Sequence, residues 1–216
     1  MSTSLAISTE KEQHRKKLIL ASQSPRRREL LKQLGYQFTS QASDIDETIL
    51  SDETANNYVL RLAREKAMHV FSSLPPAEQK YCCVLGSDTS VVFEDKILGK
   101  PINLTDCIKT LSLLSDKQHQ VLTAIALVSP EGVQAQVVTT KVTFKKLSKS
   151  EIQAYWLTGE PQDKAGSYGI QGIAGQFVTN MQGSYSAVVG LPLFETAQLL
   201  NSAGFVGAIN ASSLFK

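Results

Sequence analysis

The stretch that decides the fold reads KLILASQSPRRRELLKQLG and covers residues 17–35. Lys17 to Ala21 form a short apolar run, which is typical of a buried strand. Ser24 suits the N-cap of a helix, Pro25 suits the first helical position, and Gly35 suits the residue after the last turn. The stretch therefore predicts a strand, a tight turn and a helix.

Outward from this unit, helical and strand patterns alternate along the chain. Apolar residues at helical spacing predict a helix over 54–71, and further helices are expected over 105–114, 148–157 and 192–204. The expected strands cover 81–86, 89–93, 96–98, 120–128 and 133–147, and a hairpin is expected over 177–187. Helices that alternate with antiparallel strand pairs predict an α/β fold with a mixed sheet.

The composition is that of an ordinary globular protein. The 216 residues are 42% hydrophobic and 19% charged, with a formal net charge of +2, so bulk charge does not indicate a nucleic-acid-binding protein. The longest apolar runs are far shorter than the ~20 residues that span a bilayer. The cysteines form no Cys-x-x-Cys pair, so a disulfide framework or a zinc site is not indicated. We therefore expect no nucleic-acid partner, no membrane association and a reduced, cytoplasmic location.

The turn from Ser22 to Arg27 is the strongest candidate for a binding site. The start of a helix presents unpaired backbone N–H groups and the positive end of the helix dipole, which favour an anion. Arg26 and Arg27 add forked donors that match phosphate oxygens. Positive side chains in a first helical turn oppose the dipole, so a bound polyphosphate would account for them. The alternative is that both arginines point into solvent.

Lys66 is a second candidate, because it lies on the apolar stripe of the helix expected over 54–71. Such a lysine either faces a cleft or packs its stem and keeps its ammonium in water. The second outcome is the commoner one for a lone lysine. Lys100, which precedes Pro101, is another possible phosphate contact.

An apolar strand is expected to end at Gly86-Ser87-Asp88-Thr89. In open α/β sheets ligands bind beyond the carboxyl ends of strands, so Asp88 stands where a catalytic base or a metal ligand would lie. A turn-forming aspartate is the alternative. Asp44, Asp46 and Glu47 form a second acidic cluster, which either joins Asp88 around Mg²⁺ or is a solvated loop.

A glycine-rich segment, GEPQDKAGSYGIQG over residues 159–172, predicts a functional loop. The amide of Gln171 carries both a donor and an acceptor, so it could read the edge of a base. A lone glutamine in a loop more often has no such role. Taken together, the arginines, the lysine, the carboxylate and this loop indicate a nucleoside triphosphate as ligand.

These motifs, with Ala63-Arg64-Glu65-Lys66-Ala67, resemble the Maf family of nucleoside triphosphate pyrophosphatases, and the resemblance extends over residues 17–204. It implies the inosine triphosphatase-like fold, a long curved mixed β-sheet flanked by helices with a central cleft. It also implies one catalytic domain over residues 17–216, with two lobes around the cleft, and a homodimer. Residues 1–16 lack periodicity and are expected to be a mobile N-terminal tail.

The resemblance implies a hydrolase that converts dTTP, UTP and modified pyrimidine nucleotides to the monophosphate and pyrophosphate. Asp88 is the implied proton acceptor or, with Glu47, a ligand of Mg²⁺ or Mn²⁺. Matches to the dTTP/UTP branch imply that Arg26, Thr89 and Gln171 choose the base, since the branch that acts on 7-methyl-GTP usually has Trp and Glu in place of Arg26 and Gln171. The implied phosphate-binding residues are Ser22, Arg26, Arg27, Lys66 and Lys100.

A second interpretation is a nucleotide-sensing inhibitor of septum formation and cell division, because the family also resembles septum-inhibition factors. Such a protein would use the same cleft without essential turnover. The acidic residues expected around Asp88 favour the enzyme, since a sensor needs no carboxylate that activates water.

The chain departs from the family pattern at three places. Ser87 replaces a frequent Ala, and Asp116 stands where a Gly usually precedes Lys117. The segment 75–78 looks lengthened, and we expect it at the surface.

Overall fold

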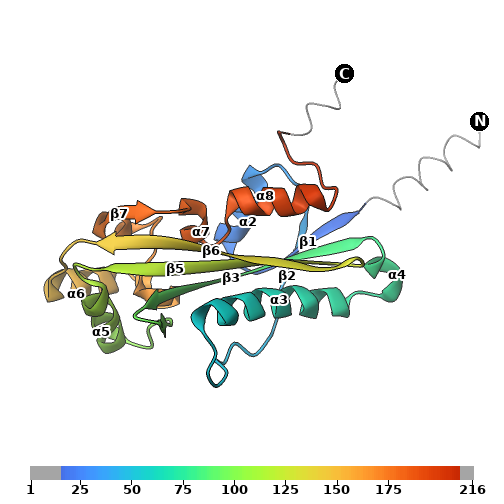
Figure 1. Cartoon of the computed structure of the whole chain (residues 1–216). Helices are drawn as coiled ribbons and strands as arrows, with labels where there is room; N and C mark the ends of the chain where they lie inside the picture. The colour runs from blue at the N-terminus through green and yellow to red at the C-terminus, as the bar shows by residue number, and fades with distance from the viewer. Residues whose placement is uncertain (1–15, 210–216) are drawn as a thin grey trace, which may run out of the picture.

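The computed structural model describes residues 16–209 and contains a mixed β-sheet (Figure 1). The strands lie in the order β2-β1-β3-β5-β6-β7, with β4 beside β3. Strands β2, β1 and β3 are parallel, whereas β4, β5, β6 and β7 run antiparallel to their neighbours. The bounds are β1 Lys17–Ala21, β2 Thr39–Gln41, β3 Cys82–Phe93, β4 Lys96–Leu98, β5 Gln118–Ser129, β6 Gly132–Phe144 and β7 Val178–Gln182. The expected α/β fold with a mixed sheet is confirmed.

Helices cover both faces of this sheet. Helix α3 lies along one face, and α2 and α8 lie on the opposite face (Figure 1). Helices α5 and α6 pack together at the end of the sheet where β5 begins and β6 ends. The bounds are α2 Pro25–Gln33, α3 Ala55–Ser73, α4 Pro76–Gln79, α5 Leu104–Leu114, α6 Lys149–Leu157, α7 Tyr185–Val189 and α8 Leu193–Ser202, with 3₁₀ helices η1 Glu160–Asp163, η2 Ala165–Ser167 and η3 Ile173–Phe177.

The first strand, turn and helix form as the sequence predicts. Pro25 is the first residue of α2, and the Ser24 side chain caps the helix by accepting a hydrogen bond from the Arg27 N–H. Gly35 follows the helix with φ +75°, a backbone conformation that glycine adopts at little cost. This unit places the start of α2 beside the carboxyl end of β1.

Strand β1 is buried on both faces, as expected for a parallel strand with helices on each side. Leu18 and Leu20 pack in a cluster with α2 and α8, whereas Ile19 and Ala21 pack in a cluster with α3. The long strands β3 and β5 continue from these clusters to a third one, under α5 and α6. A pocket is lined by residues of both this third cluster and the α2–α8 cluster.

The interruption expected between residues 86 and 89 is wrong, because β3 is one continuous strand. Strand β5 pairs with β3 along most of its length, and this ladder keeps the chain extended through Asp88. On its other edge β3 pairs with β1 up to Gly86 and with β4 from Val91 onward. Asp88 therefore lies in mid-strand, in the gap between β1 and β4 and just past the carboxyl end of β1.

The hairpin expected over 177–187 is also wrong. Strand β7 pairs with β6, and the chain then turns at Gly183 into helix α7. Gly183 has φ +127° and lies against Thr140, while the Ser184 side chain caps α7 by accepting from the Ala187 N–H. Helix α7 and the exposed strand β2 are too short to give a periodic signal in the sequence.

The three departures from the family pattern each have a structural correlate. Asp116 has φ +59°, in the left-handed region where glycine is favoured. The Ser87 hydroxyl donates a hydrogen bond to the Gly190 carbonyl oxygen at 3.0 Å. Helix α4 contains no buried residue, so the segment that includes it does lie at the surface.

Residues 1–15 and 210–216 lie outside the described residues, and with them nearly all of the expected tail at 1–16. Only Lys16 of that segment is described, and its amine donates a hydrogen bond to the Ala203 carbonyl oxygen at 3.3 Å. One domain over 17–216 stays a prediction. Among residues 16–209, no helix is long and apolar enough to cross a bilayer.

Candidate active site

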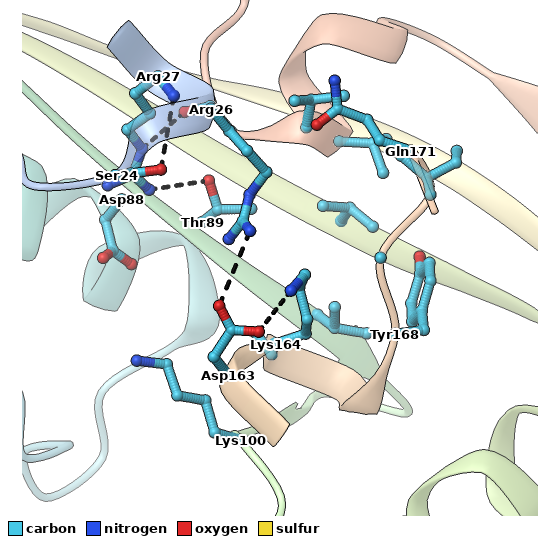
Figure 2. Close-up of a pocket in the computed structure, with 18 of the residues that line it drawn as sticks. Ser24, Arg26, Arg27, Asp88, Thr89, Lys100, Asp163, Lys164, Tyr168 and Gln171 are labelled. Carbon is cyan, nitrogen blue, oxygen red and sulfur yellow. Dashed lines mark hydrogen bonds and ion pairs between the residues drawn. The ribbon is translucent and has the colours of Figure 1, made fainter. Parts of the chain in front are cut away.

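A pocket of about 480 Å³ lies between the start of α2, strand β3 and the glycine-rich segment 159–172 (Figure 2). The expected site residues come from six separate parts of the chain, and all of them except Ser22 line this pocket. They are Arg26, Arg27, Glu47, Lys66, Asp88, Thr89, Lys100 and Gln171. The fold therefore brings the candidate phosphate-binding, catalytic and base-selecting residues to one place.

Ser22 is the one expected site residue that does not line the pocket, so its contact with phosphate stays a prediction. Its side chain is buried and is not among the groups that line the pocket. Its hydroxyl accepts a hydrogen bond from the Ser24 N–H at 3.1 Å. Ser22 thus stabilises the turn before α2, and Ser24 is the serine that lines the pocket.

Lys66 connects two carboxylates of the pocket. Its amine lies 2.7 Å from Asp88 Oδ1 and 2.7 Å from Glu47 Oε1. Lys66 and Asp88 are only 8% and 6% exposed, so the inward interpretation of Lys66 is confirmed and the snorkelling alternative is wrong. Loss of one carboxylate would leave Lys66 with the other, whereas loss of Lys66 would leave both carboxylates without this cation, which is destabilising.

Helix α3 reaches this position because Gly86 lets it approach β3 closely. A Cβ atom at Gly86 would lie 2.2 Å from the Ala63 carbonyl oxygen and 2.9 Å from the Ala67 nitrogen. Any larger residue would push the helix away from the strand. Lys66 lies between these two alanines in the sequence, and Asp88 follows Gly86 on the same strand.

Glu47 is the more exposed carboxylate of the pair, with 52% of its side chain accessible. The Tyr58 hydroxyl of α3 donates a hydrogen bond to the Glu47 carbonyl oxygen at 2.9 Å, which fixes the backbone at this residue. Burial raises the pKa of Glu47, but the hydrogen bond and charge of Lys66, with more distant cations, lower that pKa below its usual value overall. Glu47 is therefore ionised at neutral pH.

The other two members of the acidic cluster do not reach the pocket. Asp46 accepts hydrogen bonds from the Thr48 N–H at 2.9 Å and from the Thr48 hydroxyl at 2.6 Å. Asp44 is exposed and is not a lining residue. The solvated-loop interpretation thus holds for Asp44 and Asp46, and Glu47 alone joins Asp88.

Arg27 is fixed by two hydrogen bonds within the protein. Its Nε donates to the Gly190 carbonyl oxygen at 2.9 Å, and its Nη2 donates to Thr89 Oγ1 at 3.2 Å. Burial lowers the pKa of the Arg27 guanidinium, and the charge of Asp88 opposes this shift. An arginine side chain stays protonated in proteins, and among residues 16–209 the remaining N–H groups of Arg27 have no hydrogen-bond partner.

Thr123 supports Thr89 from inside the sheet. Thr123 Oγ1 lies 2.7 Å from the Ala187 carbonyl oxygen and 3.1 Å from Thr89 Oγ1. Thr123 is the donor of both contacts, so the Ala187 carbonyl oxygen and the Thr89 hydroxyl share its one hydrogen. The Thr89 hydroxyl is then engaged by Thr123 and Arg27 together, which connects β5 to the guanidinium through β3.

Arg26 points across the pocket toward η1 (Figure 2). Its Nη1 lies 3.8 Å from Asp163 Oδ2, and the Lys164 amine contacts the same carboxylate. Asp163 is 67% exposed, so both contacts lie at the solvent side of the pocket and are weak. The two cations can exchange this carboxylate for the oxygens of a ligand.

The opposite end of the pocket is apolar. Val91, Val121 and Val188 line it with Ile170, and the ring of Tyr168 adds an aromatic wall. The Tyr168 hydroxyl lies 2.8 Å from Nε2 of the buried His119. Burial lowers the pKa of the His119 ring to about 4, so the ring is neutral at pH 7. A flat, apolar ligand group would fit beside this wall.

The charges around the pocket favour a polyanion. Five cationic side chains line it against four carboxylates: Arg26, Arg27, Lys66, Lys100 and Lys164 against Glu47, Asp88, Glu160 and Asp163. Lys100 and Arg26 approach from opposite walls (Figure 2). The cationic side chains outnumber the carboxylates, and an anionic ligand would balance the excess positive charge.

A sequence model of the family described as Maf-like protein matches residues 17–203. The chain belongs to the Maf family. This Maf protein is 75% identical to a dTTP/UTP pyrophosphatase of Colwellia psychrerythraea over 194 residues, which are 90% of this chain and 92% of that protein. It is 55% identical to a dTTP/UTP pyrophosphatase of Pseudoalteromonas atlantica over 85% of this chain and 95% of the relative. A dTTP/UTP pyrophosphatase of Vibrio vulnificus is 54% identical over 86% and 97% of the two chains.

Several residues of this Maf site carry no sequence signal of their own. His119 lies on β5 and Thr123 four residues later, and both are buried behind the pocket rather than exposed in it. Glu160, Asp163 and Lys164 belong to the glycine-rich motif, but nothing in their spacing assigns a role to any of them. Only the packing of distant elements reveals what these residues contact.

Proposed function

We propose that this Maf protein hydrolyses dTTP and UTP between the α and β phosphates, giving the monophosphate and pyrophosphate. The observation that carries the proposal is the convergence of Arg27, Lys66 and Asp88 on one pocket with Gln171. The relative with 75% identity bears the name of this activity, which supports the proposal. In the cell the reaction would remove pyrimidine triphosphates, modified ones included, from the nucleotide pool.

The triphosphate would lie among the cationic groups at the start of α2. Arg27 uses its Nε and one Nη2 hydrogen within the protein, so its other N–H groups remain for phosphate oxygens. Arg26 and Lys100 would bind the outer phosphates from the two walls. Because charge develops on the leaving pyrophosphate, these cations stabilise the transition state more than the bound substrate.

Asp88 would accept the proton of the attacking water. Its Oδ1 accepts the hydrogen bond from Lys66, whereas its Oδ2 makes no hydrogen bond within residues 16–209. The water oxygen attacks the α phosphorus, the bond to the bridging oxygen breaks, and pyrophosphate leaves. Lys66 orients the carboxylate during this step.

A divalent cation, Mg²⁺ or Mn²⁺, is part of the proposal. Within residues 16–209 there is no cluster of three or more His, Cys, Asp or Glu side chains that could hold a metal by itself. Glu47 and Asp88 each bind the Lys66 amine through one carboxylate oxygen, which leaves the second oxygen of each for a cation, and Mg²⁺ is commonly bound by one or two carboxylates together with substrate phosphates. These two residues therefore fit a cation that is shared with the triphosphate. When bound, the cation would polarise the phosphoryl oxygens.

The base would lie at the apolar end, against Tyr168, with Gln171 at its edge. Uracil and thymine offer an acceptor beside an N–H donor, and an amide held in one orientation complements both. Thr89 and Arg26 would select the pyrimidine by limiting the space beside it. The homodimer and the cytoplasmic location stay part of this proposal.

The test is a panel of nucleoside triphosphates with Mg²⁺ or Mn²⁺, with separate detection of pyrophosphate and orthophosphate. We expect pyrophosphate from dTTP and UTP, with higher kcat/KM than from CTP, ATP or GTP. Release of orthophosphate instead would contradict cleavage between the α and β phosphates. Tight binding of UTP without any release would favour the nucleotide-sensing inhibitor of septum formation.

A further inference from the structure

The amide of Gln171 has no hydrogen-bond partner within the described residues 16–209, and the side chain is exposed. Its position in the pocket therefore depends on the backbone of the loop that carries it. That loop, Gly169–Ala174, joins η2 to the first turn of η3. The groups that fix this backbone also fix the amide.

Glu160 holds the loop on the carboxyl side of Gln171. Its Oε2 accepts a hydrogen bond from the Ile173 N–H at 2.8 Å, and its Oε1 accepts one from the Ala174 N–H at 3.3 Å. These N–H groups open a 3₁₀ helix and have no partner within it. A carboxylate at this place binds both of them at once.

Tyr155 holds the loop on the amino side of Gln171. Its hydroxyl donates to Glu160 Oε1 at 2.8 Å and accepts from the Gly169 N–H at 3.3 Å. Tyr155 is buried in α6, where its ring packs edge-on against Phe177 with 5.1 Å between centroids. One carboxylate and one hydroxyl therefore bind the loop on both sides of the glutamine.

The backbone of the loop also lies very close to the Glu160 carboxylate at Gly172. A Cβ atom at Gly172 would lie 2.2 Å from Glu160 Oε2, so the loop backbone rests directly on the carboxylate. Gly172 has no side chain to prevent this approach. The loop can therefore move toward or away from the base only if the Glu160 carboxylate moves with it.

We propose that Glu160 and Tyr155 are positioning residues that determine base selection by fixing the backbone around Gln171. This inference rests on the proposed function, because it concerns the same site. In this proposal neither Glu160 nor Tyr155 contacts the reacting phosphates. Its consequence is that loss of the pair alters which base is accepted, while the binding of the phosphate chain is unchanged.

Glu160→Gln is the sharpest test, because glutamine has nearly the same shape but only one acceptor oxygen. The new NH₂ group takes the place of either Oε2, where it faces the Ile173 N–H, or Oε1, where it faces the Ala174 N–H and the Tyr155 hydroxyl. In both orientations a donor faces another donor, and a hydrogen bond to the loop is lost. We expect the ratio of kcat/KM for UTP to that for CTP to fall about threefold to fivefold, the size of one weakened hydrogen bond. Tyr155→Phe keeps the ring and should change the ratio in the same direction.

Glu151→Gln is the matched control. Glu151 also accepts a backbone N–H, that of Ser148 at 2.8 Å, but it caps α6 and does not line the pocket. It should leave the ratio unchanged. Inhibition by inorganic tripolyphosphate, which has no base, should be the same in the wild type and in all three variants.

Combination with Gln171→Ala separates positioning from a general loss of structure. In that background Glu160→Gln should have no further effect on the UTP-to-CTP ratio, because the group that it positions is gone. The inference would be overturned if the UTP-to-CTP ratio were unchanged in both Glu160→Gln and Tyr155→Phe. It would also be overturned if Glu160→Gln lowered that ratio as much in the Gln171→Ala background as in the wild type.

Hydrogen–deuterium exchange of the full chain tests the inference without turnover. In Glu160→Gln the amides of Gly169, Ile173 and Ala174 should exchange faster, whereas in Glu151→Gln they should not. Unchanged exchange would overturn the inference even if the nucleotide assay succeeds. A wild type that releases no pyrophosphate would instead contradict the proposed function, whatever the exchange rates are.

Discussion

The two ends of the pocket are built in different ways. The phosphate end, formed by Arg27, Lys66 and Asp88, lies on regular helices and a strand, and its charges are bound to one another or to the backbone. The base end, formed by Tyr168 and Gln171 with its apolar lining, lies on short 3₁₀ helices and a loop. The Gln171 amide has no partner within the described residues.

This difference teaches where turnover and selectivity are controlled. Groups on packed helices and strands are held in place by many contacts, so their geometry changes little when a ligand binds. A loop can vary without disturbing the core, and such segments commonly carry specificity. Changes at the phosphate end should therefore alter turnover, whereas changes at the base end should alter the choice of nucleotide.

Asp88→Asn should give the largest effect. An amide cannot take the water proton, so kcat for UTP should fall about 10³-fold, within the range for a lost general base. The fold should persist because Lys66 keeps Glu47 as a partner. Pyrophosphate release and thermal unfolding are the measurements, with Asp95→Asn in an exposed turn as control. Near-normal release by Asp88→Asn would contradict the role of Asp88.

The second prediction concerns stability at the base end. His119, which supports Tyr168, has a pKa of about 4 in the folded protein because of burial, against 6.5 when exposed. Between these values the unfolded chain binds more protons, so the free energy of unfolding should fall as the pH is lowered from 6.5 to 4. The loss should be about 3 kcal/mol.

Urea unfolding at pH 7 and pH 4.5 measures this effect. His119→Gln should reduce the difference between the two pH values, because the variant has no ring to protonate. The other titrating groups are common to both proteins and cancel in the comparison. Equal pH dependence in wild type and variant would show that His119 is not the group responsible.

Thr123→Val should give a smaller effect, which acts through Thr89 and Arg27. The valine cannot donate to Thr89, so Thr89 and the Arg27 guanidinium bonded to it lose their fixed orientation. We expect KM for UTP to rise about tenfold. Thr123→Ser keeps the hydroxyl and should behave as the wild type. If serine is as damaging as valine, the hydroxyl is not the relevant group.

Gln171→Glu should have the smallest effect of these variants. It should change the choice of nucleotide and leave the stability of the fold nearly unchanged. The amide is exposed and without a partner within residues 16–209, so the free energy of unfolding should change by less than about 0.5 kcal/mol. A carboxylate cannot donate to a pyrimidine carbonyl, so discrimination in favour of UTP and dTTP should weaken about fivefold. Identical kinetics on all triphosphates before and after the change would refute this role.

The site could be predicted from sequence where one short segment carries both the structure and the chemistry. The turn before α2 is such a case, since Ser24 caps the helix and the first turn that follows carries Arg26 and Arg27. Prediction was less accurate where a contact with another element decides the outcome. The local pattern predicts a strand over 81–86, but pairing with β5 keeps the chain extended through Asp88.

Ser22 and Lys66 show which features of a site the local sequence leaves open. Ser22 lies in the binding turn, yet its hydroxyl is used by Ser24. Lys66 had snorkelling as its commoner alternative, yet its amine is buried between two carboxylates. In each case the direction of one side chain depends on partners elsewhere in the chain, which local spacing does not specify.

The sequence by itself determined the longer helices, most of the longer strands and the residue types of the site, because helix caps, apolar periodicity and the Maf motifs are local properties of the chain. The tertiary structure decided which of those residues meet. Gly86 lets α3 approach β3 so that Lys66 reaches Asp88, and Glu160 with Tyr155 fixes the loop of Gln171. Such contacts join residues far apart in the sequence, so they exist only after the sheet and its helices have packed.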